Sequence, residues 1–235
     1  MQNGKLYLIP TPLGDGKTES VIPQGTLDIL HTLRFFIVEE LRTAERYLRK
    51  NGFKTPVEEL TFFILNEHTK EKDIPAFLEP LLKGNDAGLL SEAGAPAVAD
   101  PGAALIALAH RKLIEVIPLV GPSSLLLALM ASGLNGQSFA FAGYLPVKPL
   151  ERQQRIRQLE KHSIKWQQTQ LFIETPYRNH SLLNDLLTCC APHTRLCIAA
   201  NITMPDAYIR TQTIEEWKKT KLSIHKKPSI FLIQG

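Results

Sequence analysis

The chain has 235 residues, enough for one large domain or two small ones. Hydrophobic residues make up 44% and charged residues 21%, an ordinary globular composition that argues against disorder over most of the length. The formal net charge of +4 permits a nucleic-acid partner without requiring one, because dedicated nucleic-acid binders carry stronger and more clustered positive charge.

Cysteine usage and the apolar stretches point to a compartment. The three cysteines are Cys189, Cys190 and Cys197. Their odd number and the lack of a CxxC pair argue against a disulfide framework or a zinc site and favour a reducing environment. The first residues lack the form of a signal peptide, and the longest apolar stretch falls short of the ~20 residues of a membrane span. We therefore expect a cytoplasmic protein with no bound metal and no membrane partner.

In the first half, short apolar runs alternate with helix-like segments. In chain order we expect a strand at 6–9, a helix at 27–33, a strand at 35–38, a helix at 42–50, a strand at 62–65, a helix at 74–82, a strand at 87–90, a helix at 103–111 and a strand at 116–117. Nearly continuous apolar strands are typical of a parallel sheet that is covered on both faces. The repeated strand–helix units predict a mostly parallel α/β domain over residues 1–118.

The second half continues the pattern with closer strands. We expect a helix at 123–131, a strand at 139–142, a polar helix at 150–162, a strand at 171–173, a helix at 182–189 and strands at 196–199, 207–211 and 230–233. Because several strands follow one another without a helix between them, this sheet is expected to be mixed. The sequence thus predicts a second α/β domain over residues 119–235.

Glycine and proline gather in three loops that directly follow predicted strands, at residues 10–14, 91–102 and 118–124. In open α/β sheets, ligands bind outside the carboxyl ends of the strands. The third loop also opens a helix, whose free N–H groups favour a carboxylate or a phosphate. The alternative is that all three are ordinary turns. Neither GxGxxG after the first strand nor GxxxxGK[ST] is present, which argues against dinucleotide enzymes and P-loop NTPases.

The same loops resemble a known family. The matching motifs are Leu6-Tyr-Leu-Ile-Pro-Thr-Pro-Leu-Gly14, Leu89-Leu-Ser-Glu-Ala-Gly-Ala-Pro96 with Asp100-Pro-Gly102, and Pro118-Leu-Val-Gly-Pro-Ser-Ser124. They resemble the tetrapyrrole-methylase superfamily, the class III S-adenosylmethionine-dependent methyltransferases. Within it, the chain is most similar to the bacterial 16S ribosomal-RNA 2′-O-ribose (cytidine) methyltransferase branch. That branch is matched further by Ala131-Ser-Gly-Leu134, Gly143-Tyr-Leu-Pro146 and Glu174-Thr-Pro-Tyr-Arg178.

The resemblance implies two α/β/α domains, a homodimer, and S-adenosylmethionine bound in a cleft between the domains. It implies cofactor contacts at Pro12, Ser91, Glu92, Ala93, Gly94, Ala95, Ser123, Ser124, Tyr144, Leu145 and Pro146. The helix start at 122–124 is suited to the methionine carboxylate. Leu145 is expected to form part of an apolar slot for adenine.

The chain departs from that branch mainly on the substrate side. Glu-Asp-Thr-Arg of the branch is replaced by Glu39-Glu-Leu-Arg42, Ser-Asp-Ala-Gly-Thr-Pro by Ser91-Glu-Ala-Gly-Ala-Pro96, and Arg-Glu-Leu-Thr-Lys by Ala200-Asn-Ile-Thr-Met204. The implied function is methylation of a ribose 2′-hydroxyl in ribosomal RNA, with the small ribosomal subunit as partner. Two alternatives remain open: a methylase of a tetrapyrrole or other small molecule, and a cofactor-binding interaction protein that has lost catalysis.

The candidate catalytic residues follow predicted strands. Transfer to a hydroxyl benefits from a base, and Glu39 or Glu40 is placed to act as one, with Arg42 binding a phosphate. The alternative is an acidic helix N-terminus, which the helix dipole favours. His68, beside Glu67, is a second candidate base or an incidental loop histidine.

A further candidate group is Glu174, Tyr177 and Arg178, where Tyr177 is suited to stack on a base and the alternative is an internal Glu–Arg pair that fixes the loop. Positive charge also gathers at Arg152, Arg155, Arg157, Lys161 and Lys165, preceded by Lys148, and again at Lys218, Lys219, Lys221, Lys226 and Lys227. These residues are suited to RNA phosphates or, alternatively, form a solvated face.

Overall fold

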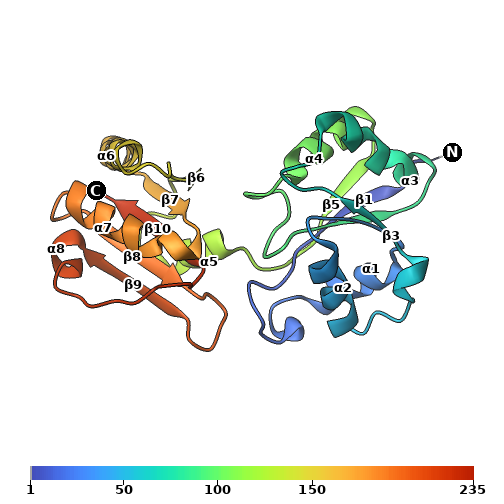
Figure 1. Cartoon of the computed structure of the whole chain (residues 1–235), viewed down its shortest axis with the longest axis horizontal. Coiled ribbons are helices and arrows are strands. Elements are labelled where there is room, and N and C mark those ends of the chain that lie inside the picture. The colour runs from blue at the N-terminus through green and yellow to red at the C-terminus, as the bar shows by residue number, and fades with distance from the viewer. Residues whose placement is uncertain (1) are drawn as a thin grey trace. The chain divides into compact units, whose positions relative to one another are not determined.

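A computed structural model describes residues 2–235 and divides the chain into two compact units, an N-terminal unit that ends at Ser123 and a C-terminal unit, Ser124–Gly235 (Figure 1). The sequence placed the boundary after residue 118. Residues 119–123 stay with the N-terminal unit because they pack against it. Thr26 Oγ1 donates a 2.9 Å hydrogen bond to the carbonyl oxygen of Val120, and Gly121 lies against Pro10.

The N-terminal unit contains a five-stranded sheet in which all neighbouring strands are parallel. Its strands are β1 (Lys5–Ile9), β2 (Phe35–Val38), β3 (Thr61–Ile64), β4 (Ala87–Leu90) and β5 (Glu115–Pro118), in the spatial order β3-β2-β4-β1-β5. The predicted parallel sheet is therefore confirmed. Because every strand runs the same way, the loops that follow β1, β2 and β4 emerge at one edge.

Helices and two hydrophobic cores cover this sheet. The helices are α1 (Gln24–Thr32), α2 (Leu41–Lys50), α3 (Glu79–Leu82) and α4 (Gly102–Arg111), with 3-10 turns η1 (Thr18–Ser20), η2 (Val57–Glu59) and η3 (Glu71–Leu78). Neighbouring strand residues point to opposite faces, so Phe36 joins the core with Leu30 and Leu48 whereas Ile37 joins the core with Leu105. Burying such side chains contributes about 1.5–3 kcal/mol each, which is why the strands are apolar on both faces.

One predicted helix of this unit is wrong in type. Residues 74–82 were expected to form a single helix, but the structure has the 3-10 segment η3 followed by the four-residue α3. Pro75 lies inside η3, and Pro80 lies at the start of α3. Because proline lacks an N–H and its ring displaces the preceding turn, a continuous α-helix cannot run through these positions.

The C-terminal unit contains the expected mixed sheet. Its strands are β6 (Phe139–Tyr144), β7 (Thr169–Ile173), β8 (Arg195–Ala200), β9 (Tyr208–Thr213) and β10 (Ser229–Gln234), in the order β6-β7-β10-β8-β9. β6 and β7 are parallel, and the other neighbouring pairs are antiparallel. All six residues of β10 are buried, as its central position requires.

The helices of this unit are α5 (Ser124–Ser132), α6 (Pro149–Trp166), α7 (Asn179–Cys189) and α8 (Ile214–Trp217), with the 3-10 turn η4 (Pro176–Arg178). α8 was not predicted, although Thr213 and Glu216 form a capping box at its start, a spacing visible in the sequence. Trp217 at its end is buried and donates a 2.8 Å hydrogen bond to the carbonyl oxygen of Leu196. Within residues 2–235, no helix has the length and apolar character needed to cross a bilayer.

Arg152 corrects the expectation of an exposed basic face on α6. Its side chain is 3% exposed and is enclosed between α6 and α7. Its guanidinium donates to Asp185 Oδ2 at 2.6 Å, to Ser181 Oγ at 2.8 Å and to the carbonyl oxygen of Val147 at 3.2 Å. Arg152 therefore holds two helices together and is not available to an RNA phosphate, whereas Arg157 is exposed.

We predict that Arg152→Leu destabilises the protein by about 3–5 kcal/mol, because it leaves the Asp185 carboxylate without its buried partner. The shift in the urea unfolding midpoint measures the effect. Arg157→Leu on the same helix is the control and should stay within about 0.5 kcal/mol of the parent protein. Equal stability of the two variants would contradict a structural role for the Arg152–Asp185 pair.

Candidate active site

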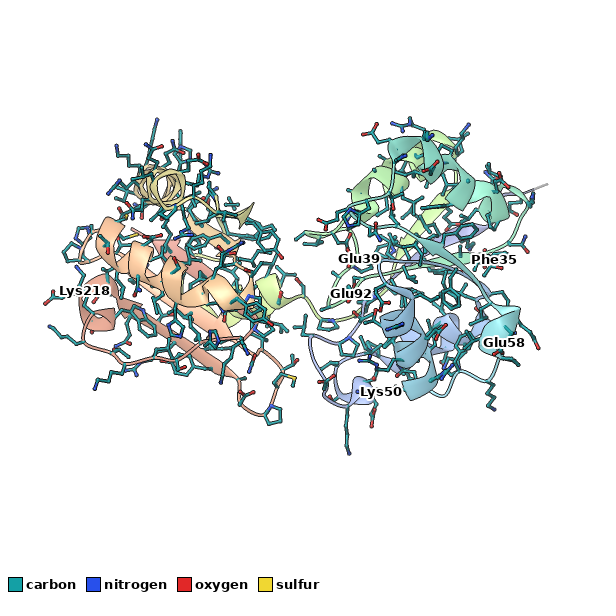
Figure 2. The ribbon with its side chains drawn as sticks, viewed as in Figure 1. Phe35, Glu39, Lys50, Glu58, Glu92 and Lys218 are labelled. Atoms are coloured by element: carbon teal, nitrogen blue, oxygen red, sulfur yellow. The ribbon has the colours of Figure 1, made fainter. Side chains whose placement is uncertain are left out.

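The candidate site lies where the strands of the N-terminal unit end. Phe35 marks the start of β2, and Glu39 follows its end, beside Glu92 from the loop after β4 (Figure 2). The loop after β1 reaches the same edge and carries Pro12. The parallel order of the strands thus brings together residues from three separate parts of the sequence.

A short antiparallel bridge joins the loop after β1 to the loop after β4. Thr11 and Gly94 exchange two backbone hydrogen bonds of 3.0 Å. Ser91 adds to the bridge because its hydroxyl donates to the Gly94 carbonyl at 2.7 Å and its own carbonyl accepts from Thr11 Oγ1 at 3.2 Å. Gly94 has φ +81°, and a Cβ there would lie 3.0 Å from Leu13, so the position requires glycine. Ser91 and Gly94 shape the loop, while Glu92 and Ala93 are exposed.

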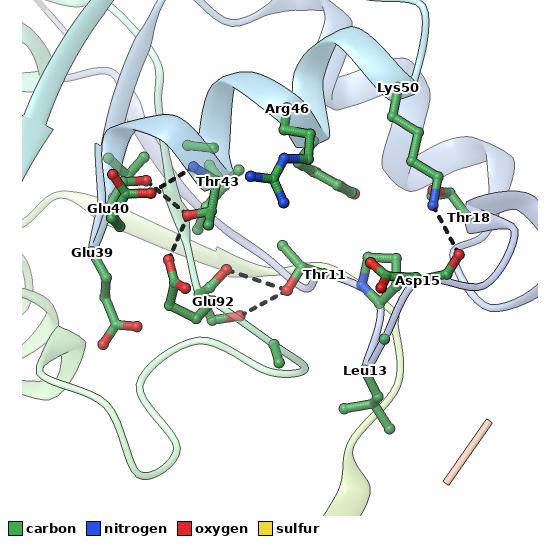
Figure 3. A pocket seen from close by; sticks show the side chains of 18 residues that line it. Thr11, Leu13, Asp15, Thr18, Glu39, Glu40, Thr43, Arg46, Lys50 and Glu92 are labelled. Carbon is green, nitrogen blue, oxygen red and sulfur yellow. Dashed lines mark hydrogen bonds between the residues drawn. The ribbon is translucent and has the colours of Figure 1, made fainter. Parts of the chain in front are cut away.

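A cavity of about 270 Å³ opens between these loops and one face of α2 (Figure 3). Of the residues that the sequence singled out, its lining includes Pro12, Glu39, Glu40, Ser91, Glu92 and Ala93. The sequence reading missed further polar lining residues: Thr18, Thr43, Arg46, Tyr47 and Lys50. The last four follow a spacing of three and four residues that puts them on one face of a helix, so a signal was present.

Glu40 is the N-cap of α2. Its carboxylate accepts backbone hydrogen bonds from Arg42 at 3.0 Å and Thr43 at 2.8 Å. These bonds lower the pKa of the Glu40 carboxyl below its usual range. For Glu40, the structure therefore shows the capped helix start that the sequence left open as an alternative. Thr43 also donates from its hydroxyl to Glu92 Oε1 at 2.6 Å, which fixes that carboxylate at the cavity.

Glu39 differs from its neighbour because it is half-buried. Burial raises the pKa of its carboxyl, and the negative charges of Asp100 and Glu92 raise it further, against a hydrogen bond from the Glu92 backbone N–H. Glu39 also lines a second hollow of about 560 Å³ that it shares with Glu67, Glu92 and Asp100. A carboxylate whose pKa is raised above its ordinary value is a better base, and so is suited to accept a proton from a substrate hydroxyl.

Arg42 and His68 lie outside the lining of both cavities. Arg42 is exposed at the start of α2, and the His68 ring is exposed beside Glu67, with 3.7 Å between Nε2 and Oε1. The structure brings Glu39 and Glu92 together but leaves Arg42 and His68 at the surface. A role for Arg42 and His68 in binding or catalysis stays a prediction.

In the C-terminal unit, Glu174 and Arg178 form the internal pair that the sequence offered as an alternative. The Glu174 carboxylate has no exposed area, and its Oε1 accepts from Arg178 at 2.6 and 2.9 Å and from the backbone N–H of Thr175 at 2.6 Å. These hydrogen bonds raise the pKa of the Arg178 guanidinium. The pair holds the loop that carries Tyr177, whose ring is 73% exposed.

The remaining predicted cofactor residues differ in accessibility. Ser123 and Ser124, at the start of α5, are half-buried, as are Ala95 and Pro146. Tyr144 is exposed at the end of β6. Leu145 is 3% exposed and belongs to the hydrophobic core with Ile156 and Phe172, so its side chain forms no open wall for adenine.

Comparison with known proteins places this site in a family context. The sequence profile of the family described as Tetrapyrrole (Corrin/Porphyrin) Methylases matches residues 5–218. The chain is similar to a protein of Vibrio cholerae named Ribosomal RNA small subunit methyltransferase I, with 29% identity over 98% of this chain and 77% of the relative. A protein of the same name from Synechocystis is 31% identical over 85% of this chain and 67% of the relative.

Two solved structures share the fold. The methyltransferase CobJ has a TM-score of 0.64 at 19% identity and covers 99% of this chain and 94% of its own. Cobalt precorrin-4 methyltransferase CbiF, a cobalamin biosynthetic enzyme, has a TM-score of 0.61 at 16% identity and covers 98% and 94%. These likenesses confirm the expected fold class of two α/β domains.

The pKa of Glu39 leads to a pH-dependent prediction. Because its folded-state pKa lies above the ordinary value of 4.5, ionised Glu39 destabilises the folded protein, and the loss of stability grows as the pH rises from 4.5 through the folded-state pKa. Glu39→Gln should therefore raise the urea midpoint at neutral pH and leave it unchanged below pH 4.5. A pH-independent difference between the two proteins would contradict the raised pKa of Glu39.

Proposed function

Because the chain belongs to the tetrapyrrole (corrin/porphyrin) methylase family, we propose that it transfers a methyl group from S-adenosylmethionine to a ribose 2′-hydroxyl of ribosomal RNA. The protein is a methyltransferase, and its relatives in Vibrio cholerae and Synechocystis carry ribosomal RNA small subunit in their names. The observation that carries the proposal is the half-buried Glu39 carboxylate, with its raised pKa, at the cavity where three strand ends meet.

The residues present fit the cofactor. Ser124 opens α5, a nine-residue helix whose first-turn N–H groups suit the methionine carboxylate. Within the N-terminal unit, the exposed Glu92 carboxylate suits ribose hydroxyls or positive charge. Within the C-terminal unit, the exposed ring of Tyr144, two residues before Pro146, suits the adenine. When bound, S-adenosylmethionine supplies an already activated methyl group.

The contribution of the protein is then alignment and proton removal. Glu39 would accept the proton of the 2′-hydroxyl as the hydroxyl oxygen takes up the methyl group that bound S-adenosylmethionine would supply. Arg42 and His68, exposed at the same edge, contact the RNA backbone. Glu174 is a positioning residue that acts through Arg178 on the loop of Tyr177, whose ring stacks on a base.

The small ribosomal subunit is the proposed partner, and a cytoplasmic location is proposed with it, because ribosomes assemble and work there. The homodimer that the family resemblance implies is part of the same proposal.

The acceptor is tested by transfer of a labelled methyl group to small ribosomal subunits, followed by mapping of the modified nucleotide. We expect label on one ribose, and loss of at least about a hundredfold in kcat for Glu39→Gln, the low end for removal of a general base. Label on a tetrapyrrole but not on RNA would contradict the proposed acceptor and identify a tetrapyrrole in its place. Absence of S-adenosylmethionine binding at millimolar concentration would exclude both methylase alternatives.

The cofactor assignment has its own test. Ser124→Trp should weaken S-adenosylmethionine binding about tenfold or more in calorimetry, because the indole fills the space at the first turn of α5. Ser223→Trp, an exposed loop position, is the control and should bind like the parent protein. Equal affinity of the two variants would move the cofactor away from the start of α5.

A further inference from the structure

The cavity in the N-terminal unit has a second end that the proposed chemistry does not use. Glu39 and Glu92 lie at one end, and Thr18 and Lys50 lie at the other, with the Arg46 side chain between them (Figure 3). One end is therefore acidic, and the other presents the Thr18 hydroxyl and the Lys50 ammonium together with the exposed Asp15 carboxylate.

Two buried hydroxyls of residues that line this cavity have no hydrogen-bond partner within residues 2–235. They are Thr18 Oγ1 and Tyr47 Oη, and both residues line the cavity. Thr18 is 2% exposed, so its side chain cannot turn outward to bulk solvent. Because buried hydroxyls are normally paired, two unpaired ones at the same cavity point to a polar ligand.

Arg46 is the available charge. It forms no ion pair within the part of the chain that the structure describes, and none of the hydrogen bonds drawn in Figure 3 reaches its guanidinium. Lys50 has a different task because its Nζ donates to the carbonyl oxygens of Gly16 at 2.7 Å and Asp15 at 3.4 Å. Lys50 thus fastens the loop that walls the cavity, and Arg46 remains free to bind an anion.

The chemistry of the three groups agrees. Burial raises the pKa of Tyr47 to about 12, so its hydroxyl stays protonated in neutral solution. Thr18 and Tyr47 then offer O–H donors, and Arg46 offers a fork of N–H donors that matches a phosphate. A nucleotide carries both a phosphate and ribose hydroxyls. The carboxylates of Glu39 and Glu92 at the other end of the cavity can accept hydrogen bonds from such hydroxyls.

We propose that Arg46, Thr18 and Tyr47 form a phosphate subsite for the acceptor nucleotide of the RNA substrate. The subsite rests on the proposed function, and it adds a residue that determines specificity for the acceptor nucleotide. A phosphate held at this end directs the attached ribose towards Glu39 and Glu92. Arg46 thereby selects a nucleotide over an uncharged nucleoside.

The test is calorimetric or NMR titration with cytidine 5′-monophosphate and, in parallel, with cytidine. The parent protein should bind the monophosphate at millimolar concentration, and Arg46→Gln should weaken that binding about tenfold or more, because a charge-assisted pair is lost. Thr18→Val, which removes one donor and keeps the shape, should weaken it several-fold. Cytidine should bind the parent and Arg46→Gln alike.

Arg49→Gln is the matched control. Arg49 lies on the same helix with a side chain that is 71% exposed, and it does not line the cavity. It should bind the monophosphate within about twofold of the parent protein. Equal affinity of the Arg46→Gln and Arg49→Gln variants, or no binding to the parent protein, would overturn the subsite.

Two further arms separate the possible anions and the two proposals. If Arg46→Gln weakens the binding of S-adenosylhomocysteine and not that of the monophosphate, the anion at Arg46 is the carboxylate of the cofactor product and the subsite is refuted. On ribosomal subunits, Arg46→Gln should raise KM more than it lowers kcat. If Arg46→Gln loses monophosphate binding but the parent protein methylates no RNA, the proposed acceptor is refuted. If the parent protein methylates RNA and Arg46→Gln does so with an unchanged KM, the subsite alone is refuted.

Discussion

The bridge between Thr11 and Gly94 is the interaction on which the candidate site depends. It joins the loop after β1 to the loop after β4 through two backbone hydrogen bonds, reinforced by the Ser91 hydroxyl. Without it, Pro12 and Glu92 would belong to two independent loops, and no fixed cavity would lie between them. The bridge requires a left-handed backbone at Gly94. The conformational freedom of this one glycine therefore determines how the loops that carry Pro12 and Glu92 are placed at the cavity.

Several acidic side chains lie near that bridge, and burial and their mutual proximity destabilise the ionised form of Glu39. Burial raises the pKa of Glu39, and repulsion by the charges of Asp100 and Glu92 raises it further. Glu40 does not share this repulsive role because the N-terminus of α2 satisfies its carboxylate, and Thr43 fixes Glu92. The adjacent acids Glu39 and Glu40 thus differ in environment: Glu40 caps a helix, whereas Glu39 is half-buried with a raised pKa.

Much of the fold could be predicted because apolar strands and turn residues act locally. Strands β2 and β4 appear at the predicted residues, and the mixed second sheet follows from the spacing of its strands. The apolar pattern over residues 74–82 has a helical period, but the prolines at 75 and 80 prevent one continuous helix there. The candidate site was predicted less completely. Loop motifs predicted Pro12 and Glu92, and the end of a predicted strand indicated Glu39. The α2 face with Arg46 and Lys50, however, resembles an ordinary charged helix until its packing is known.

Burial is the property that a single sequence hides best. Arg152 and Arg157 lie on one helix and look alike in sequence, but only Arg152 meets a carboxylate across a helix–helix contact and loses its exposure. The same reasoning applies to Arg46 and Arg49 on α2, where position on the helix surface separates a cation at a cavity from a cation in solvent. A net charge of +4 therefore carries little information about substrate binding. What matters is which cations lack a protein partner beside unpaired buried hydroxyls, and in the N-terminal unit Arg46 meets that condition.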